Sequence, residues 1–273
     1  MTLEQLCMVL DWAASEGWNP GRHDAACFHA VDPDGFLIGM VDGEAVASIF
    51  AVKYGATFGF IGGYIVKPGF RAHGYGIQIW KAAMAYLTGR TVGLDGVLAQ
   101  QANYAKSGFV LAYRNIRCEG SGSGAAPADE GVVALSSLPW DEVCRYDRAL
   151  FPDDRTRFLQ CWLGQPDDVA IGVVEAGSVC GVAVLRPCRN GYKIGPLFAD
   201  TPALAERLFV QMQGSSPLGA PLFLDVPESN AAAMALAHRH QLQQCFETAR
   251  MYTGPLPDLG LARQFGVTTF ELG

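Results

Sequence analysis

The sequence lacks a surplus of positive charge and any paired cysteine motif, and each absence excludes a class of function. Among 273 residues, 20 Lys and Arg stand against 27 Asp and Glu, which gives a formal net charge of −7. Nucleic acid and acidic membranes are bound by clustered Lys and Arg, so we expect neither as a partner. The eight cysteines include no Cys-x-x-Cys pair, which argues against a zinc ribbon or a thioredoxin-type redox site. Most lie within apolar runs, where we expect them to be buried and reduced.

A basic leader and a long uninterrupted apolar run are also missing. The chain opens with Leu3, Leu6 and Leu10 interspersed with Glu4 and Asp11, which is typical of an amphipathic helix and not of a signal peptide. Half of the residues are hydrophobic and 17% are charged, a globular composition, and the length fits one large domain or two ordinary ones. We therefore predict a soluble, cytoplasmic protein.

Turn signals and apolar periodicity divide the first half into helices and strands. Asp42-Gly43 between two apolar runs is a strong hairpin signal. Thr2 is suited to cap a first helix, and Ile77, Trp80, Met84 and Leu87 predict one apolar face on a later helix. The expected strands are 36–41, 44–54, 58–66, 93–98 and 109–118, and the expected helices are 3–16, 23–28, 77–87 and 102–106.

The second half repeats the first. The stretch 38–43 is matched by 171–176, and Ile61-Gly62 is matched by Ile194-Gly195, at the same offset of 133 residues (171 − 38 and 194 − 61). Between the halves, residues 119–130 begin with a run of Gly and Ser that has no apolar periodicity and is typical of a flexible linker. We predict two copies of one fold in three segments, 1–118, 119–130 and 131–273.

One strand–turn–helix segment, residues 64–87, is suited to bind an anion. Pro68 ends the strand, and the turn 71–76 precedes a helix whose N-terminus attracts negative charge. A P-loop is excluded because Tyr75 and Gly76 replace the required Lys and Ser or Thr, and no G-x-G-x-x-G motif is present. The corresponding segment of the second half, 199–204, has no Arg and no glycine pair. We therefore predict a single anion site.

Two motifs resemble those of the GNAT superfamily of acyl-CoA-dependent N-acyltransferases. The first is Arg71-x-x-Gly74-x-Gly76 after a strand ending Val66-x-Pro68, which is similar to the family's pyrophosphate loop. The second is 103–109, Asn-Tyr-Ala-Lys-Ser-Gly-Phe, which is similar to the family's downstream Asn…Tyr-x-x-x-Gly-Phe element. The second half has Ala237 at the tyrosine position, and it resembles the degenerate C-terminal GNAT-like domain of two-lobed bacterial acetyltransferases.

The resemblance implies a mixed α/β, α+β-like fold: two tandem GNAT folds, each with a mostly antiparallel twisted sheet, a central parallel strand pair and flanking helices. It implies acetyl-CoA as cofactor and transfer of acetyl to a primary amine, on a small molecule or peptide, by direct attack in a ternary complex. Tyr104 would protonate the leaving thiolate. The implied cofactor contacts are Ile65, Val66, Arg71, Ala72, His73, Gly74, Tyr75, Gly76 and Asn103.

The proton acceptor and the amine site are less directly indicated. Strand 58–66 has no carboxylate, although many members of the family have a Glu there. Asp95 is a candidate catalytic base, but the second half, which lacks the anion motif, has an aspartate at the matching position, Asp225, and this favours a structural role. Trp18, Asn19 and Asp24 are expected to line the amine site by analogy with the family. The spacing His238-x-His240 places the two rings on different helix faces, so no metal site is predicted. Because strand 58–66 has no carboxylate to act as a base, an alternative stays open: the protein is a non-catalytic acyl-CoA-binding or regulatory module.

Overall fold

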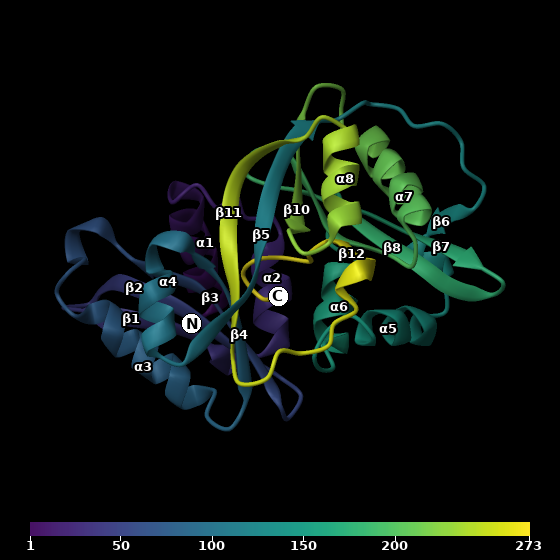
Figure 1. The fold of residues 1–273 in the computed structure, drawn as a ribbon. Coiled ribbons are helices and arrows are strands. Elements are labelled where there is room, and N and C mark those ends of the chain that lie inside the picture. The colour runs from purple at the N-terminus through teal and green to yellow at the C-terminus, as the bar shows by residue number, and fades with distance from the viewer.

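The computed structural model describes residues 1–273 as two similar sets of elements joined in one sheet (Figure 1). The first set is α1 (Leu3–Ser15), α2 (Asp24–Val31), β1 (Phe36–Val41), β2 (Glu44–Tyr54), β3 (Phe58–Val66), α3 (Tyr75–Tyr86), β4 (Thr91–Val97), α4 (Gln101–Lys106) and β5 (Phe109–Ser121). The second set is β6 (Val132–Ala134), α5 (Trp140–Arg148), α6 (Thr156–Trp162), β7 (Val169–Glu175), β8 (Ser178–Pro187), β9 (Tyr192–Ala199), α7 (Pro202–Ser215), β10 (Pro221–Pro227), α8 (Ala231–Arg239), β11 (Gln243–Thr253) and β12 (Gln264–Gly266).

The two halves exchange one long strand each, β5 and β11. The sheet order is β1-β2-β3-β4-β11-β5-β10-β9-β8-β7-β6, with β12 paired to β9. Thus β11, from the second half, lies between β4 and β5 of the first, and β5 lies between β11 and β10 (Figure 1). Only β3–β4 and β9–β10 are parallel pairs. The predicted mixed fold, with two similar halves and one parallel pair in each, is confirmed.

The predicted internal repeat is visible in the order of elements. β1 and β7 form matching hairpins with β2 and β8, and the later strands β3, β4 and β5 correspond to β9, β10 and β11. Each half also has a short helix before its last strand, α4 or α8. The parallel pairs occupy the same place in both halves. Ile61 and Ile194 lie at the last residue of the pairing in each half, which agrees with the match between Ile61-Gly62 and Ile194-Gly195.

Two local predictions need correction. The predicted linker 119–130 begins with strand residues, because β5 continues to Ser121 and pairs there with Pro221 of β10. The predicted apolar face of the motif helix is also wrong in part. Trp80 and Leu87 are buried as predicted, but Ile77 is 52% exposed and Ile79 is buried in its place. The helix also begins at Tyr75, two residues earlier than predicted.

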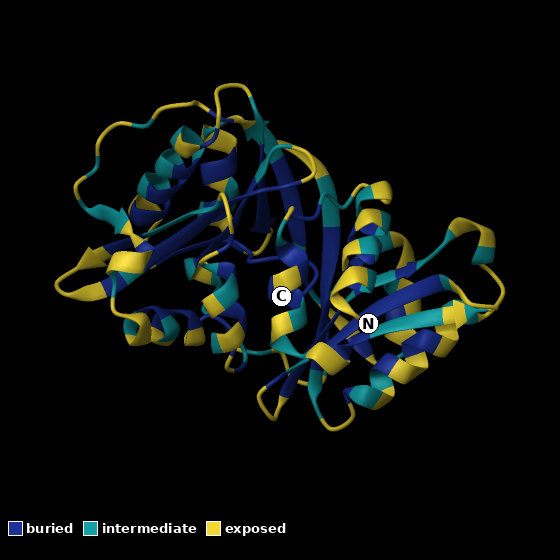
Figure 2. Ribbon diagram, turned by 180° about the vertical axis from the view of Figure 1, so that it is seen from behind, coloured by how far each residue is buried: buried dark blue, intermediate teal, exposed yellow.

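Buried residues join the two halves into a common core. Figure 2 shows the central strands as a continuous buried band, and one apolar cluster contains Phe28 of α2 with Phe158 and Trp162 of α6. The ring planes of Phe28 and Trp162 are stacked with centroids 6.1 Å apart. Against the expectation that cysteines within apolar runs are reduced, Cys27 and Cys161 form a disulfide between these helices. None of the helices has the length and apolarity needed to cross a membrane.

Candidate functional site

The main cavity opens where the parallel strands β3 and β4 separate. They pair from Phe58–Thr91 to Ile61–Leu94, and beyond these residues β3 pairs only with β2. The separation leaves backbone N–H and C=O groups of β3 facing a cavity of about 500 Å³. Its walls include Ile61, Gly62, Gly63, Tyr64, Ile65 and Val66 of β3, Leu94, Asp95, Gly96 and Val97 of β4, and Glu16, Trp18, Arg71, Trp80, Tyr104, Phe246, Thr248, Phe270 and Glu271.

The predicted anion loop lies at one end of this cavity. Ala72 and Gly74 have positive φ angles of 66° and 83°, and Gly74 is the residue that caps the N-terminus of α3. This backbone leaves the amides of residues 72–77 without a backbone acceptor in the chain. A helix of twelve residues follows, so its unpaired amides and its dipole favour an anion at this point.

Arg71 links the loop to the rest of the cavity wall. Its Nε donates to the Val66 carbonyl over 2.8 Å, and its Nη2 pairs with Glu16 at the end of α1. The ring of His73 donates from Nδ1 to the Arg71 carbonyl over 2.8 Å, which fixes the turn. Gly76 has a packing reason, because a Cβ there would lie 2.6 Å from the Tyr64 hydroxyl. Of the six predicted loop residues, 71–76, only Arg71 is part of the cavity wall.

Tyr104 lies in the cavity wall on α4. Its ring stacks on Trp80 with centroids 5.4 Å apart, and Trp80 is held in turn by a 3.0 Å hydrogen bond from its indole to Ser107. A Cβ at Gly96 would lie 2.2 Å from the Tyr104 ring, so that glycine makes room for it. Burial, with a smaller contribution from Tyr64, raises the pKa of Tyr104, so the phenol keeps its proton.

The neighbouring Asn103, predicted as a cofactor contact, faces its own helix. Its side chain accepts from Lys106 and donates to the Gln100 side chain over 2.8 Å. It is exposed and is absent from the cavity wall. These contacts indicate that Asn103 stabilises its own helix.

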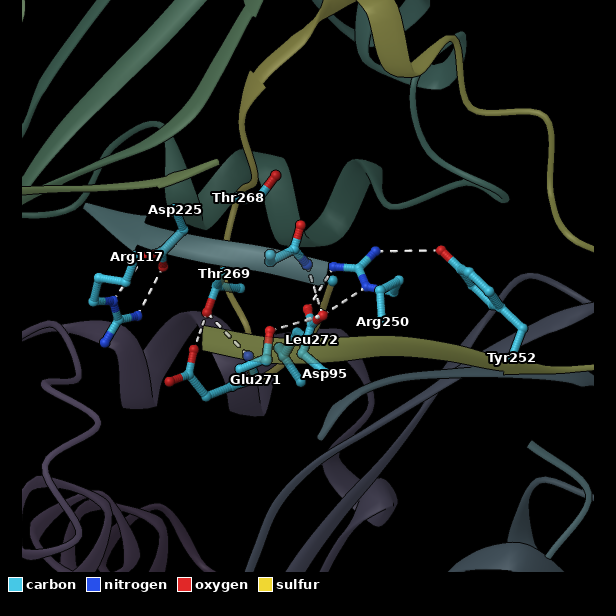
Figure 3. A network of polar contacts seen from close by, with 12 residues as sticks. Asp95, Arg117, Asp225, Arg250, Tyr252, Thr268, Thr269, Glu271 and Leu272 are labelled. Atoms are coloured by element: carbon cyan, nitrogen blue, oxygen red, sulfur yellow. Dashed lines mark hydrogen bonds and ion pairs between the residues drawn. The ribbon is translucent and has the colours of Figure 1, made fainter. Parts of the chain in front are cut away.

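Asp95 is held in a buried ion pair. Its carboxylate accepts from Arg250 of β11 at 2.5 and 2.9 Å (Figure 3). It also accepts from Asn115 of β5 at 2.7 Å. Burial raises the pKa of Asp95, and the Arg250 charge opposes this rise. The pair occupies both carboxylate oxygens, although the residue borders the cavity.

The second half repeats this arrangement. Asp225 of β10 accepts from Arg117 of β5 at 2.6 and 2.7 Å, and the two pairs lie in equivalent places on the exchanged strands (Figure 3). Burial disfavours the Asp225 charge, but Arg117 outweighs it and lowers the pKa of Asp225. Because each pair joins one half to a strand from the other, the echo of Asp95 in Asp225 reflects a structural role of both carboxylates.

The structure separates the three residues predicted for the amine site. Trp18 lines the cavity. Asn19 does not line the cavity, and its side chain forms hydrogen bonds of 2.8 and 2.9 Å with the backbone of Asn190. Asp24 is fully buried and pairs with Arg186 at 2.7 Å. The prediction for Asp24 is therefore wrong, because an aspartate neutralising a buried arginine is closed to substrate.

Sequence reasoning missed the part of the cavity wall that the second half supplies. Phe246 and Thr248 come from β11, and Phe270 and Glu271 come from the segment after β12. The strand exchange brings them there, and no motif or periodicity surrounds them in the sequence. A Cβ at Gly62 would lie 2.0 Å from the Glu271 carbonyl, so only a glycine permits this approach.

The equivalent cleft of the second half is filled by the chain itself. β9 and β10 pair as far as Ile194–Leu224, and beyond them β12 pairs with Leu197 and Phe198 of β9. These residues correspond to Tyr64 and Ile65 of β3 at the offset of 133 (197 − 64 and 198 − 65). The free edge that β3 presents to the cavity is thus covered in the second half.

Comparison with known proteins agrees with this geometry. Residues 3–109 match the model described as "Acetyltransferase (GNAT) family", and residues 143–266 match "Acetyltransferase (GNAT) domain". A curated relative from Pseudoalteromonas sp., "Holothin acyltransferase", is 30% identical over 100% of this chain and 92% of its own length.

Two solved structures share the fold over most of their length. A putative acetyltransferase from Pyrococcus horikoshii superposes with a TM-score of 0.84 at 23% identity, covering 100% of this chain and 94% of that one. A tandem GNAT protein from the clavulanic acid biosynthesis pathway gives a TM-score of 0.61 at 14% identity, covering 93% and 96%. The chain belongs to the GNAT family of acyltransferases, with two GNAT domains in tandem.

Proposed function

We propose that this protein transfers an acetyl group from acetyl-CoA to a primary amine by direct attack in a ternary complex. The observation that carries the proposal is the cavity between β3 and β4, which has an anion-binding loop at one end and a protonated tyrosine in its wall. GNAT acyltransferases use acyl-CoA donors and amine acceptors, and the family assignment therefore supports both substrate classes.

The free edge of β3 supports the placement of the cofactor arm. Near Ile65 and Val66, β3 pairs with β2 on one edge and has no strand partner on the edge that faces the cavity. Backbone groups on that open edge are suited to pair with the amides of pantetheine as an added strand would. The amides of residues 72–77 and the charge of Arg71 then bind the pyrophosphate. In this pose Ala72, His73, Gly74, Tyr75 and Gly76 contribute mainly backbone.

The reaction needs a nucleophilic amine and a protonated leaving group. The amine nitrogen bonds to the thioester carbon and the carbon–sulfur bond breaks. Tyr104 gives its proton to the departing thiolate. A phenol is protonated at neutral pH, and burial raises the pKa of Tyr104 further. Because β12 covers the equivalent cleft of the second half, we expect one acyl-CoA per chain.

The test is thiol release from acetyl-CoA with a panel of amines: n-butylamine, benzylamine, aniline and holothin, the last prompted by the name of the curated relative. We expect release that depends on the amine and saturates with acetyl-CoA, with the acetylated amine detected by mass. Calorimetry should give one CoA site per chain. CoA binding without transfer to any amine would instead favour the non-catalytic acyl-CoA-binding or regulatory module.

A further inference from the structure

We propose that Glu271 is the proton acceptor for the amine in this reaction, supplied to the first-half cavity by the segment that follows β12. The inference rests on the proposed acyl transfer and assigns its missing base. It concerns a residue from the second half of the chain, although the cofactor loop and Tyr104 belong to the first.

The cavity has three carboxylates in its walls, and two of them are engaged. Asp95 is held by Arg250 and Asn115, and Glu16 pairs with Arg71 of the anion loop. Glu271 forms no ion pair within salt-bridge distance. One of its carboxylate oxygens accepts from the Thr269 hydroxyl, whose oxygen also accepts from the Glu271 amide over 3.3 Å (Figure 3). The other oxygen makes no bond to the protein.

A backbone contact between Glu271 and β3 fixes the position of the Glu271 carboxylate in the cavity wall. The carbonyl of Glu271 lies against Gly62, in space that a side chain at position 62 would fill. Phe270 and Leu272 on either side are buried, and the Tyr54 hydroxyl donates to the Leu272 carbonyl over 3.0 Å. Glu271 is therefore held beside the point where β3 and β4 separate, on the wall that completes the cavity.

Glu271 is largely excluded from water and lies near three cationic side chains. Glu271 is 4% exposed, and the cations that act on it are Arg117 of β5, Arg186 of β8 and Lys193 of β9. Arg117 is itself packed against the Phe270 ring, 4.8 Å from its centroid, and neutralised by Asp225. The other ionisable groups in the cavity wall are Glu16, Tyr64, Arg71, Asp95 and Tyr104.

These features fit the proton balance of the reaction. An alkylamine acceptor such as benzylamine arrives as an ammonium ion and must lose two protons to become an amide. Glu271 accepts the first directly or through one water, which frees the nitrogen lone pair to attack the thioester carbon. The second leaves the nitrogen after it has bonded to the thioester carbon, and it replaces the proton that Tyr104 gives to the thiolate as the carbon–sulfur bond breaks. Glu271 passes the first proton to solvent. One proton in total is released to solvent.

The experiment compares Glu271→Gln with the wild-type chain, using benzylamine and acetyl-CoA. Gln keeps the side-chain size and an oxygen for the Thr269 hydroxyl but cannot take a proton. We expect kcat/KM for benzylamine at neutral pH to fall about 100-fold or more, the size typical of a lost general base. The wild-type rate should level off below the pKa of the amine, whereas the variant rate should keep rising about tenfold per pH unit until the amine deprotonates itself.

Three controls make the result decisive. Glu175→Gln, an exposed position at the end of β7, should behave as the wild type. The affinity of Glu271→Gln for CoA and its Tm should stay close to wild-type values. Glu271→Asp, which keeps a carboxylate, should have a kcat/KM for benzylamine at least about tenfold higher than that of Glu271→Gln.

Two outcomes would overturn the role of Glu271 and leave the acyl transfer intact. In one, Glu271→Gln keeps wild-type kcat/KM and pH profile. In the other, the Gln and Asp variants lose activity equally and also lose CoA affinity, which indicates a structural effect. If the wild-type chain acetylates none of the panel amines, the proposed transfer fails and the role fails with it.

Discussion

At the scale of single residues, Tyr104 is the group whose environment is most clearly arranged for one protonation state. Trp80 stacks on its ring, Gly96 leaves room for it, and burial raises its pKa above the ordinary phenol value of about 10. No side chain or carbonyl of the chain is bonded to its hydroxyl. Since the protonated form is retained at higher pH than usual, deprotonation of Tyr104 should not limit the rate at moderately alkaline pH.

The corresponding prediction is that Tyr104→Phe lowers kcat about 100-fold or more and leaves CoA affinity unchanged, because the ring packing is kept and only the proton donor is lost. Steady-state thiol release gives kcat, and calorimetry gives the affinity. Tyr192→Phe, in β9 of the second half, is the matched control and should retain full activity. Wild-type turnover in Tyr104→Phe would remove this phenol from the mechanism.

Residues were predictable from sequence where a local motif fixes their surroundings. Arg71 and Tyr104 belong to short motifs, and both line the cavity. Asp24 could not be judged in the same way, because its partner Arg186 is far along the chain and the pair forms only after the halves assemble. Glu271 was unpredictable for the same reason. Its place depends on contact with Gly62, which no spacing in the sequence reveals.

At the scale of elements, the loop before α3 depends on a left-handed residue at its helix cap. Gly74 has a φ of 83° and open space around its Cα, so its glycine is required by conformation and not by crowding. The sequence correctly indicated a glycine turn before a helix. It placed Trp80 and Leu87 on the buried face correctly but misplaced Ile77, because apolar spacing alone does not show which side of the helix the sheet covers.

We predict that Gly74→Ala costs about 1 kcal/mol of folding free energy and weakens CoA binding about tenfold, since a strained cap moves the amides that face the anion. Gly177→Ala is a matched control. That turn between β7 and β8 has a φ of 82° and equally open surroundings, but it lies away from the cavity. It should show the same stability loss in denaturant titration with unchanged CoA affinity. Equal CoA affinity in both variants would contradict the assignment of the loop.

At the scale of the whole molecule, the strand exchange decides what the halves do separately. The repeat and its register were readable from the sequence, because hairpins and turns are local. The exchange was not, because β11 is equally compatible with its own half by pattern alone. Two buried ion pairs, Asp95–Arg250 and Asp225–Arg117, lie across the exchanged strands. Each half therefore leaves a buried charge unpaired when it is isolated, which is strongly destabilising.

We accordingly predict that residues 1–130 alone do not form a cooperatively folded, CoA-binding domain, because β4 and β5 would lack the strand between them. Circular dichroism melting and calorimetry with CoA measure this. A full-length chain with a protease site introduced in the exposed stretch Ser123–Gly124 is the control. After cleavage it should keep its CoA affinity, since both strands remain in place although the connection is cut. A soluble 1–130 fragment with full activity would show that the first half needs neither the exchanged strand nor Glu271.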